Sequence, residues 1–183
     1  MVGNYYKCGD WQKFVSLSDP QLSSKCILIY TKGSGKGGQK RNKTSNRVQV
    51  KFFHLSTSEE ASRYLSLNIT KALRKLRFKI SLDIIPNYNL RPLPSLLLSS
   101  KYKKINLHSL RENKPDYPLF CGWLLDSFIA QGGDWKLLSK KLTISNSQMT
   151  SWFAANALVK EKFLQVRQSI KNPTTALDKE DIT

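Results

Sequence analysis

The chain has 183 residues, 30 of them Lys or Arg and 13 Asp or Glu, so its formal net charge is +17 at pH 7. This length fits one domain or two small ones, and a hydrophobic fraction of 40% argues against disorder throughout. The sequence has no run of 18 apolar residues, which excludes a spanning helix, and its N-terminus resembles neither a secretory signal nor a transit peptide. Three widely spaced cysteines fit neither a disulfide framework nor a zinc site. We therefore expect no metal, no cofactor, no membrane association and a reducing, cytoplasmic location.

The positive charge is unevenly distributed along the chain. Residues 1–115 contain 22 Lys or Arg and 6 Asp or Glu, whereas residues 116–183 contain 8 and 7. Between Asp19 and Glu59 there is no acidic residue. Such a concentration of basic residues favours a polyanionic partner, above all nucleic acid. A membrane surface is a weaker alternative, because the densest charge lies in a glycine-rich segment and not on an amphipathic helix.

Two strands flanking a basic loop are predicted in the first part of the chain. Residues 1–19 are expected to form a short polar lead-in. Apolar and β-branched residues predict strands at 24–32 and 47–55. The segment between them, 32–46, has four glycines and no apolar residue, so we predict a loop.

One long helix is predicted over residues 56–82. Ser56 with Glu59, and Thr57 with Glu60, have the spacing of a capping box. Apolar residues then recur every three or four positions, at Leu65, Ile69, Ala72, Leu73, Leu76 and Ile80. The expected fold of residues 1–83 is therefore α+β, with a mixed sheet packed on this helix.

The remainder of the chain predicts a connector and a helical domain. Residues 84–117 are rich in proline and polar residues, and we assign them as a connector. Residues 118–172 are expected to form an all-α domain, followed by a polar tail at 173–183.

The helical domain has the pattern of a helix-turn-helix module. Helices are predicted at 119–131, 134–142 and 146–170, the first ended by Gly132 and Gly133. The apolar and turn positions of the motif are occupied by Ser139, Leu142, Thr143, Ile144, Ser145, Met149 and Trp152. The candidate contacts on its second helix are Asn146, Ser147, Gln148 and Ser151. The alternative is a helical module that only packs a core, since the net charge of residues 116–183 is just +1.

The glycine-rich segment fits neither common nucleotide-binding pattern. A P-loop requires lysine at the position of Gln39, and the glycine spacing does not match the dinucleotide motif. Adjacent Gly37 and Gly38 can adopt positive φ and allow another chain to approach the backbone closely. A backbone N–H at Gln39 could stabilise the oxygen charge that develops during acyl transfer, while neighbouring cations hold the phosphates of an RNA end.

This segment resembles the GGQ loop of class I peptide chain release factors and ribosome-rescue peptidyl-tRNA hydrolases. The family pattern is roughly Ser-Gly-x-Gly-Gly-Gln-x-x-Asn-Lys, followed by a strand. The matching residues here are Ser34, Gly35, Gly37, Gly38, Gln39, Asn42, Lys43 and Thr44. Further downstream, Arg63, Asn68, Ala72 and Leu73 match, while Tyr64 and Leu65 replace a Ser-Gln pair. The resemblance covers roughly residues 14–82.

The resemblance implies hydrolysis of the ester bond of peptidyl-tRNA in the peptidyl-transferase centre of the ribosome. The catalytic residues would be Gly37, Gly38 and Gln39, with water as the nucleophile. The ribosome and peptidyl-tRNA would be the partners, no cofactor would be needed, and the protein would act as a monomer. The expected tRNA and rRNA contacts are Ser34, Gly35, Lys36, Lys40, Arg41, Asn42, Lys43, Thr44, Arg63, Asn68, Lys71 and Arg74.

Departures from the family bear on specificity. The sequence has no counterpart of the domains that read stop codons, so we expect codon-independent action. The tail, 173–183, has one Lys and three acids, unlike the basic tails of small rescue hydrolases. The segment between the second strand and the helix is short, which predicts a trimmed hairpin. The replacement at Tyr64 and Leu65 supports an alternative, a non-catalytic ribosome- or RNA-binding protein. A DNA-binding regulator is a third hypothesis, against which the low charge of the helical domain argues.

Overall fold

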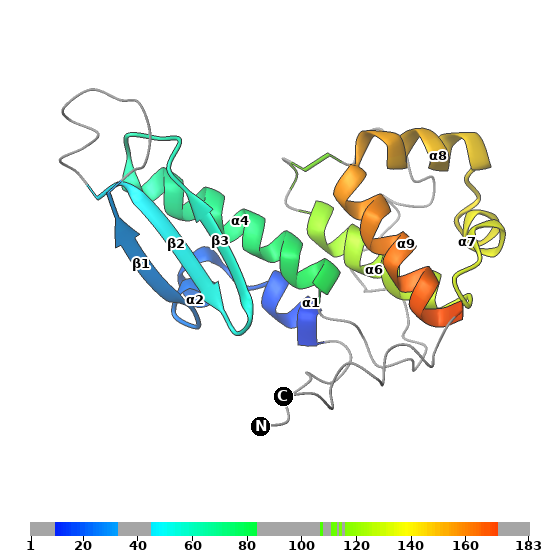
Figure 1. Ribbon diagram of the computed structural model, residues 1–183, viewed down its shortest axis with the longest axis horizontal. Coiled ribbons are helices and arrows are strands. Elements are labelled where there is room, and N and C mark those ends of the chain that lie inside the picture. The colour runs from blue at the N-terminus through cyan, green and yellow to red at the C-terminus, as the bar shows by residue number, and fades with distance from the viewer. Residues whose placement is uncertain are drawn as a thin grey trace. The chain divides into compact units, whose positions relative to one another are not determined.

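The computed structural model describes residues 10–32, 45–83, 107, 111–112, 114 and 116–171. The chain divides into two compact units: an N-terminal unit, Gly9–Ile84, and a C-terminal unit that contains the described residues beyond it. The described part of the first combines helices with a sheet, and that of the second is helical (Figure 1). The expected α+β class is therefore confirmed. In the described part of the chain, no helix has both the length and the apolar character needed to cross a bilayer.

The sheet of the N-terminal unit has three strands, β1 (Ile27–Thr31), β2 (Arg47–Phe52) and β3 (Leu55–Glu59), in that order. Both pairings are antiparallel, so within the described residues the sheet is not mixed as expected. The strands predicted at 24–32 and 47–55 correspond to β1 and β2. A tight turn at residues 53–54 joins β2 to β3, with Phe53 at a φ of 52°.

β3 corrects the helix expected to begin at residue 56. The helix α4 spans only Leu65–Asp83, and the capping-box spacing of Ser56 and Glu59 falls within a strand. Cross-strand pairing overrides this local signal, because β3 pairs with β2 along its whole length. In addition, Leu55 and Thr57 are buried, and the Thr57 hydroxyl donates to the carbonyl oxygen of Ala72 in α4 at 2.9 Å.

Two short helices correct the polar lead-in. Within the expected segment 1–19, the described part contains α1 (Asp10–Val15) and the start of α2 (Asp19–Ser23). Trp11 of α1 and Leu22 of α2 are fully buried. The core also includes Val48, Val50, Phe52, Ala72, Leu73, Leu76 and Ile80, which come from the strands and α4. A polar-looking segment can thus supply core residues when its few large apolar side chains recur at helical spacing.

The described helices of the C-terminal unit are α6 (Tyr117–Ala130), α7 (Trp135–Leu142), α8 (Asn146–Ala155) and α9 (Ala157–Lys171). α6 is buried over most of its length, as expected for a helix that is apolar on all sides. Rings from α6, α7, α8 and α9 pack in an aromatic cluster of Phe128, Trp135, Phe153 and Phe163. Gly132 and Gly133 follow the end of α6, as predicted, and both have positive φ.

The helix predicted over 146–170 is wrong in one respect, because it breaks at Asn156. The Asn156 side-chain Nδ2 donates to the carbonyl oxygen of Trp152 at 2.7 Å, and its Oδ1 accepts a hydrogen bond from the Tyr117 hydroxyl. These side-chain bonds compete with a continuous helix and tie the break to α6. The tail at 173–183 and most of the connector at 84–117 lie outside the described residues.

Candidate nucleic-acid interface at the base of the glycine segment

The glycine segment, residues 33–44, lies outside the described residues, and with it the catalytic candidates Gly37, Gly38 and Gln39. The same holds for the predicted contacts Ser34, Gly35, Lys36, Lys40, Arg41, Asn42, Lys43 and Thr44. The described part of the site is its base. There β1 ends at Thr31, β2 begins at Arg47, and Asn46 is the last residue before β2. The segment is thus the connection between two antiparallel neighbouring strands.

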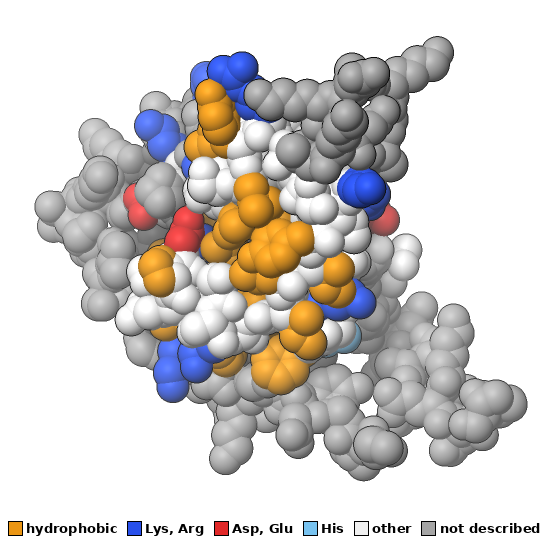
Figure 2. All heavy atoms as spheres, turned by 90° about the vertical axis from the view of Figure 1, so that its left-hand side faces the viewer, with side chains coloured by type: hydrophobic (Ala, Val, Ile, Leu, Met, Phe, Trp, Pro, Cys, Tyr) orange, Lys and Arg blue, Asp and Glu red, His pale blue; other side chains and the backbone are white. Residues whose placement is uncertain are grey.

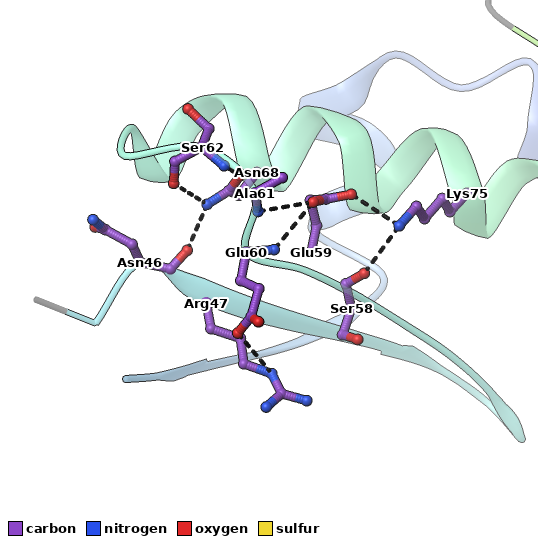
Figure 3. Close-up of polar contacts among 9 residues, drawn as sticks. All are labelled: Asn46, Arg47, Ser58, Glu59, Glu60, Ala61, Ser62, Asn68 and Lys75. Atoms are coloured by element: carbon purple, nitrogen blue, oxygen red, sulfur yellow. Dashed lines mark hydrogen bonds and ion pairs between the residues drawn. The ribbon is translucent and has the colours of Figure 1, made fainter. Parts of the chain in front are cut away.

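Asn68 joins this base to the start of α4 (Figure 3). Its Nδ2 donates to the carbonyl oxygens of Asn46, at 2.7 Å, and Ser62, at 2.8 Å. Its Oδ1 accepts from the Ser62 amide at 2.9 Å. Asn68 is fully buried, with both ends of its side chain bonded within the protein. This placement differs from the direct RNA contact expected from the sequence: Asn68 positions the backbone at the end of the glycine segment.

Asn46 makes a second link to the same region. Its Nδ2 donates to the carbonyl oxygen of Arg63 at 2.9 Å. Two asparagines therefore hold the residues just before α4 against the residue that precedes β2. The strand that follows the glycine segment is thereby tied to the start of α4 through both asparagines.

Glu59 organises the turn between β3 and α4 (Figure 3). One carboxylate oxygen accepts from the amides of Glu60, at 3.1 Å, and Ala61, at 2.9 Å, while the other is 2.9 Å from the Lys75 ammonium. The hydrogen bond from Lys75, followed by that from the Ala61 amide, lowers the pKa of Glu59 below its ordinary value. Glu60 lies 3.9 Å from the Arg47 guanidinium. Both acids beside the site are therefore paired with cations.

Arg63 and Tyr64 lie next to these links, immediately before α4. The Arg63 guanidinium lies over the Tyr64 ring, 4.8 Å from its centroid, an arrangement that favours a cation–π interaction. Tyr64 as a whole is 53% exposed. The sequence pattern presented Tyr64 only as a departure from a known family, so reasoning from motifs did not identify it as a candidate contact.

The basic residues of α4 fall into two groups. Lys75, Arg77 and Lys79 point back onto the unit, as shown by their partners: Lys75 reaches Glu59, Arg77 pairs with Asp19 at 2.7 Å, and Lys79 donates to the carbonyl oxygen of Ser56 at 2.9 Å.

The second group differs from the first in its partners. Lys71 and Arg74 are exposed, and in the described part of the chain neither has an ion-pair or hydrogen-bond partner. The predicted contacts Arg63, Lys71 and Arg74 thus remain available to a polyanion.

Figure 2 shows the face of this unit that carries β1, where hydrophobic side chains gather centrally and Lys and Arg lie around them.

The helix-turn-helix candidates are exposed, but three of them have structural roles. Asn146 Oδ1 accepts from the Ser139 hydroxyl at 2.9 Å, and Gln148 Oε1 accepts from the Ser145 amide at 3.1 Å. The Ser147 and Ser145 hydroxyl oxygens lie 3.0 Å apart. These bonds cap α8 and fix the turn from α7. Ser151 is exposed on α8.

The described residues offer no obvious alternative chemistry. Among them, no three His, Cys, Asp or Glu side chains come together in a way that could hold a metal ion. Burial raises the pKa of the Cys121 thiol and of the neighbouring Tyr117 hydroxyl, which disfavours the ionised, nucleophilic form of each. Comparison of the chain with protein-family models, curated proteins and solved structures gave no match.

Proposed function

We propose that the protein hydrolyses the ester bond of peptidyl-tRNA on the ribosome, without reading a codon. The observation that carries the proposal is the place of Gly37-Gly38-Gln39 in the chain. The triplet belongs to the connection between β1 and β2, and the residue that ends this connection is bonded to two positions before α4. These hydrogen bonds support the proposal because they join the residues on either side of the start of α4 to the strand that follows the triplet.

The proposed chemistry uses backbone groups and water. Water attacks the ester carbonyl, the tetrahedral intermediate collapses, and the tRNA 3′ oxygen leaves with a proton. The Gln39 backbone N–H stabilises the charge on the carbonyl oxygen, and the Gln39 side chain orients the water. Gly37 and Gly38 permit the close approach that a Cβ would obstruct. The cations of residues 32–43 and the exposed Arg63, Lys71 and Arg74 hold the RNA.

Peptide release from ribosomes that hold P-site peptidyl-tRNA tests the proposal. Three complexes are compared: mRNA truncated at the A site, intact mRNA with a sense codon there, and intact mRNA with a stop codon there. We expect release on the truncated message, weakened by Gln39→Ala and abolished by Gly38→Ala. Release confined to the stop-codon complex would contradict codon independence. Ribosome binding without release on any complex would instead favour the non-catalytic RNA-binding function.

A further inference from the structure

A continuous exposed stripe runs from Tyr64 along the first part of α4. We name Tyr64, Leu67, Lys71 and Arg74 the α4 stripe. Their spacing of three and four residues places them on one side of the helix, and Tyr64 belongs to this side because its carbonyl oxygen accepts from the Asn68 amide. Tyr64 is 53% and Leu67 50% exposed, and Lys71 and Arg74 are exposed as well. The stripe is about 15 Å long, at the helical rise per residue.

The charge of the stripe is entirely positive. Lys71 and Arg74 contribute the cations, and Arg63 adds a third beside Tyr64. The two acids near the start of α4 are each paired with a cation that lies outside the stripe, Lys75 for Glu59 and Arg47 for Glu60. A polyanion approaching the stripe therefore meets a positive potential, and an acid-free surface of this kind suits phosphates.

The backbone of Tyr64, at the head of the stripe, is held by two hydrogen bonds. The Tyr64 amide donates to the Ser62 hydroxyl at 3.1 Å, and its carbonyl oxygen accepts from the Asn68 amide at 3.3 Å. Asn68 is itself bonded to the carbonyl oxygen of Asn46, the last residue before β2. An exposed ring with a fixed backbone and an adjacent guanidinium is a preorganised stacking surface, since little conformational entropy is lost on binding.

We propose that the α4 stripe binds an unpaired RNA strand, with one nucleobase stacked on Tyr64 and the following phosphates contacted by Lys71 and Arg74. Leu67 lies between them and offers an apolar contact to the next base or ribose. An unpaired strand fits better than a duplex, because only an unstacked base exposes its face to an aromatic side chain. The inference rests on the proposed function and adds a specific contact site on α4.

The test is equilibrium binding of a fluorescently labelled oligoadenylate to the full chain, followed by anisotropy, with a duplex RNA of equal length for comparison. Tyr64→Leu keeps the apolar bulk but removes the ring, and Tyr64→Phe keeps the ring. We expect Tyr64→Leu to weaken binding of the single strand about tenfold and Tyr64→Phe to bind as the wild type does. Tyr30→Leu is the matched control, since Tyr30 is 46% exposed on β1 of the same unit.

The contribution of the cations in the stripe is tested separately, by the salt dependence of binding. Lys71→Ala should reduce the slope of log affinity against log salt by about 0.7, whereas Lys160→Ala on α9 should leave the slope unchanged. Thermal unfolding of each variant confirms that it is folded. Equal binding by Tyr64→Leu and the wild type, equal losses for Tyr64→Leu and Tyr30→Leu, or no binding of the single strand by the wild type would overturn the inference.

The binding assay contains no ribosome and no ester, so its result is independent of hydrolysis. Peptide release that survives Tyr64→Leu, together with unchanged oligoadenylate binding, would leave the proposed function standing without the stripe. Tyr64-dependent binding by a protein that releases no peptide would leave the stripe standing without the hydrolysis.

Discussion

The two units are stabilised by different kinds of contact, polar in the N-terminal unit and aromatic in the C-terminal unit. In the N-terminal unit, residues 9–84 contain 15 Lys or Arg and 5 Asp or Glu, and the buried Asn68 amide and the Glu59–Lys75 ion pair join the residues around the base of the glycine segment to α4. In the C-terminal unit, aromatic rings from four helices pack together. We therefore expect the function to lie in the N-terminal unit. Burying a polar network costs free energy, and this cost is offset when the network positions a functional segment.

The largest expected effect comes from removing one hydrogen-bonded asparagine from each unit, the buried Asn68 and the half-buried Asn156. Asn68→Ala leaves two carbonyl oxygens and one amide without their partner, and we expect it to lower the free energy of unfolding by about 2–3 kcal/mol. Asn156→Ala removes two hydrogen bonds in the C-terminal unit and should cost about 1–2 kcal/mol. Urea denaturation measures both effects.

The two asparagine variants should separate when peptide release is measured at a temperature where each remains folded. Asn68→Ala should slow release, because the end of the glycine segment loses its anchor, and Asn156→Ala should not. Equal release by Asn68→Ala and the wild type would show that the network is purely structural.

A smaller effect concerns the charge on Glu59. Because its pKa is lowered in the folded protein, the ionised carboxylate stabilises the fold above the ordinary pKa of Glu, and this contribution disappears as the pH falls through the folded-state value. Glu59→Gln should therefore lower stability by about 1 kcal/mol at neutral pH. The difference from the wild type should shrink at acidic pH.

Glu161→Gln on α9 serves as the control for Glu59, since Glu161 is exposed and accepts a hydrogen bond from Gln165 that glutamine can retain. In urea denaturation at neutral pH, the loss should be larger for Glu59→Gln, which gives up the ion pair with Lys75, than for Glu161→Gln. A Glu59→Gln difference that stays constant with pH would contradict the role of the charge.

The smallest expected effect lies at the turn between α7 and α8. Thr143 has a left-handed conformation, with φ of 55° and ψ of 39°, where a helix-turn-helix commonly has glycine. Thr143→Gly should raise the free energy of unfolding by about 0.5–1 kcal/mol, because glycine adopts this conformation without steric cost. Thr143→Ala retains that cost and should give no comparable gain. Equal stabilities for the glycine and alanine variants in urea denaturation would contradict the assigned strain.

Periodicity was sufficient for elements whose signal is local. Alternation at Val48, Val50 and Phe52 predicted β2, and the glycine pair at 132–133 predicted the end of α6. It failed where tertiary pairing overrides a local pattern: β3 looks like a capped helix start until its register with β2 is known. The break at Asn156 likewise depends on Tyr117, which is 39 residues away.

The candidate site likewise contains residues that local sequence signals identify and residues that depend on tertiary contacts. The sequence motifs identified the glycine segment and the exposed basic residues of α4, Lys71 and Arg74. It assigned Asn68 to RNA, although the side chain is buried in a network that only the fold creates. It also passed over Asn46, Glu59 and Tyr64, whose roles depend on contacts between β2, β3 and the start of α4.

The most direct test of the central claim is the single-turnover rate constant of peptide release on ribosomes with truncated mRNA, measured for the wild type and Gly38→Ala. Ribosome co-sedimentation is followed in parallel. The account predicts rapid release by the wild type and no release above background by Gly38→Ala, with both proteins bound to the ribosome. Release by Gly38→Ala at the wild-type rate would contradict the hydrolysis mechanism proposed for the glycine segment.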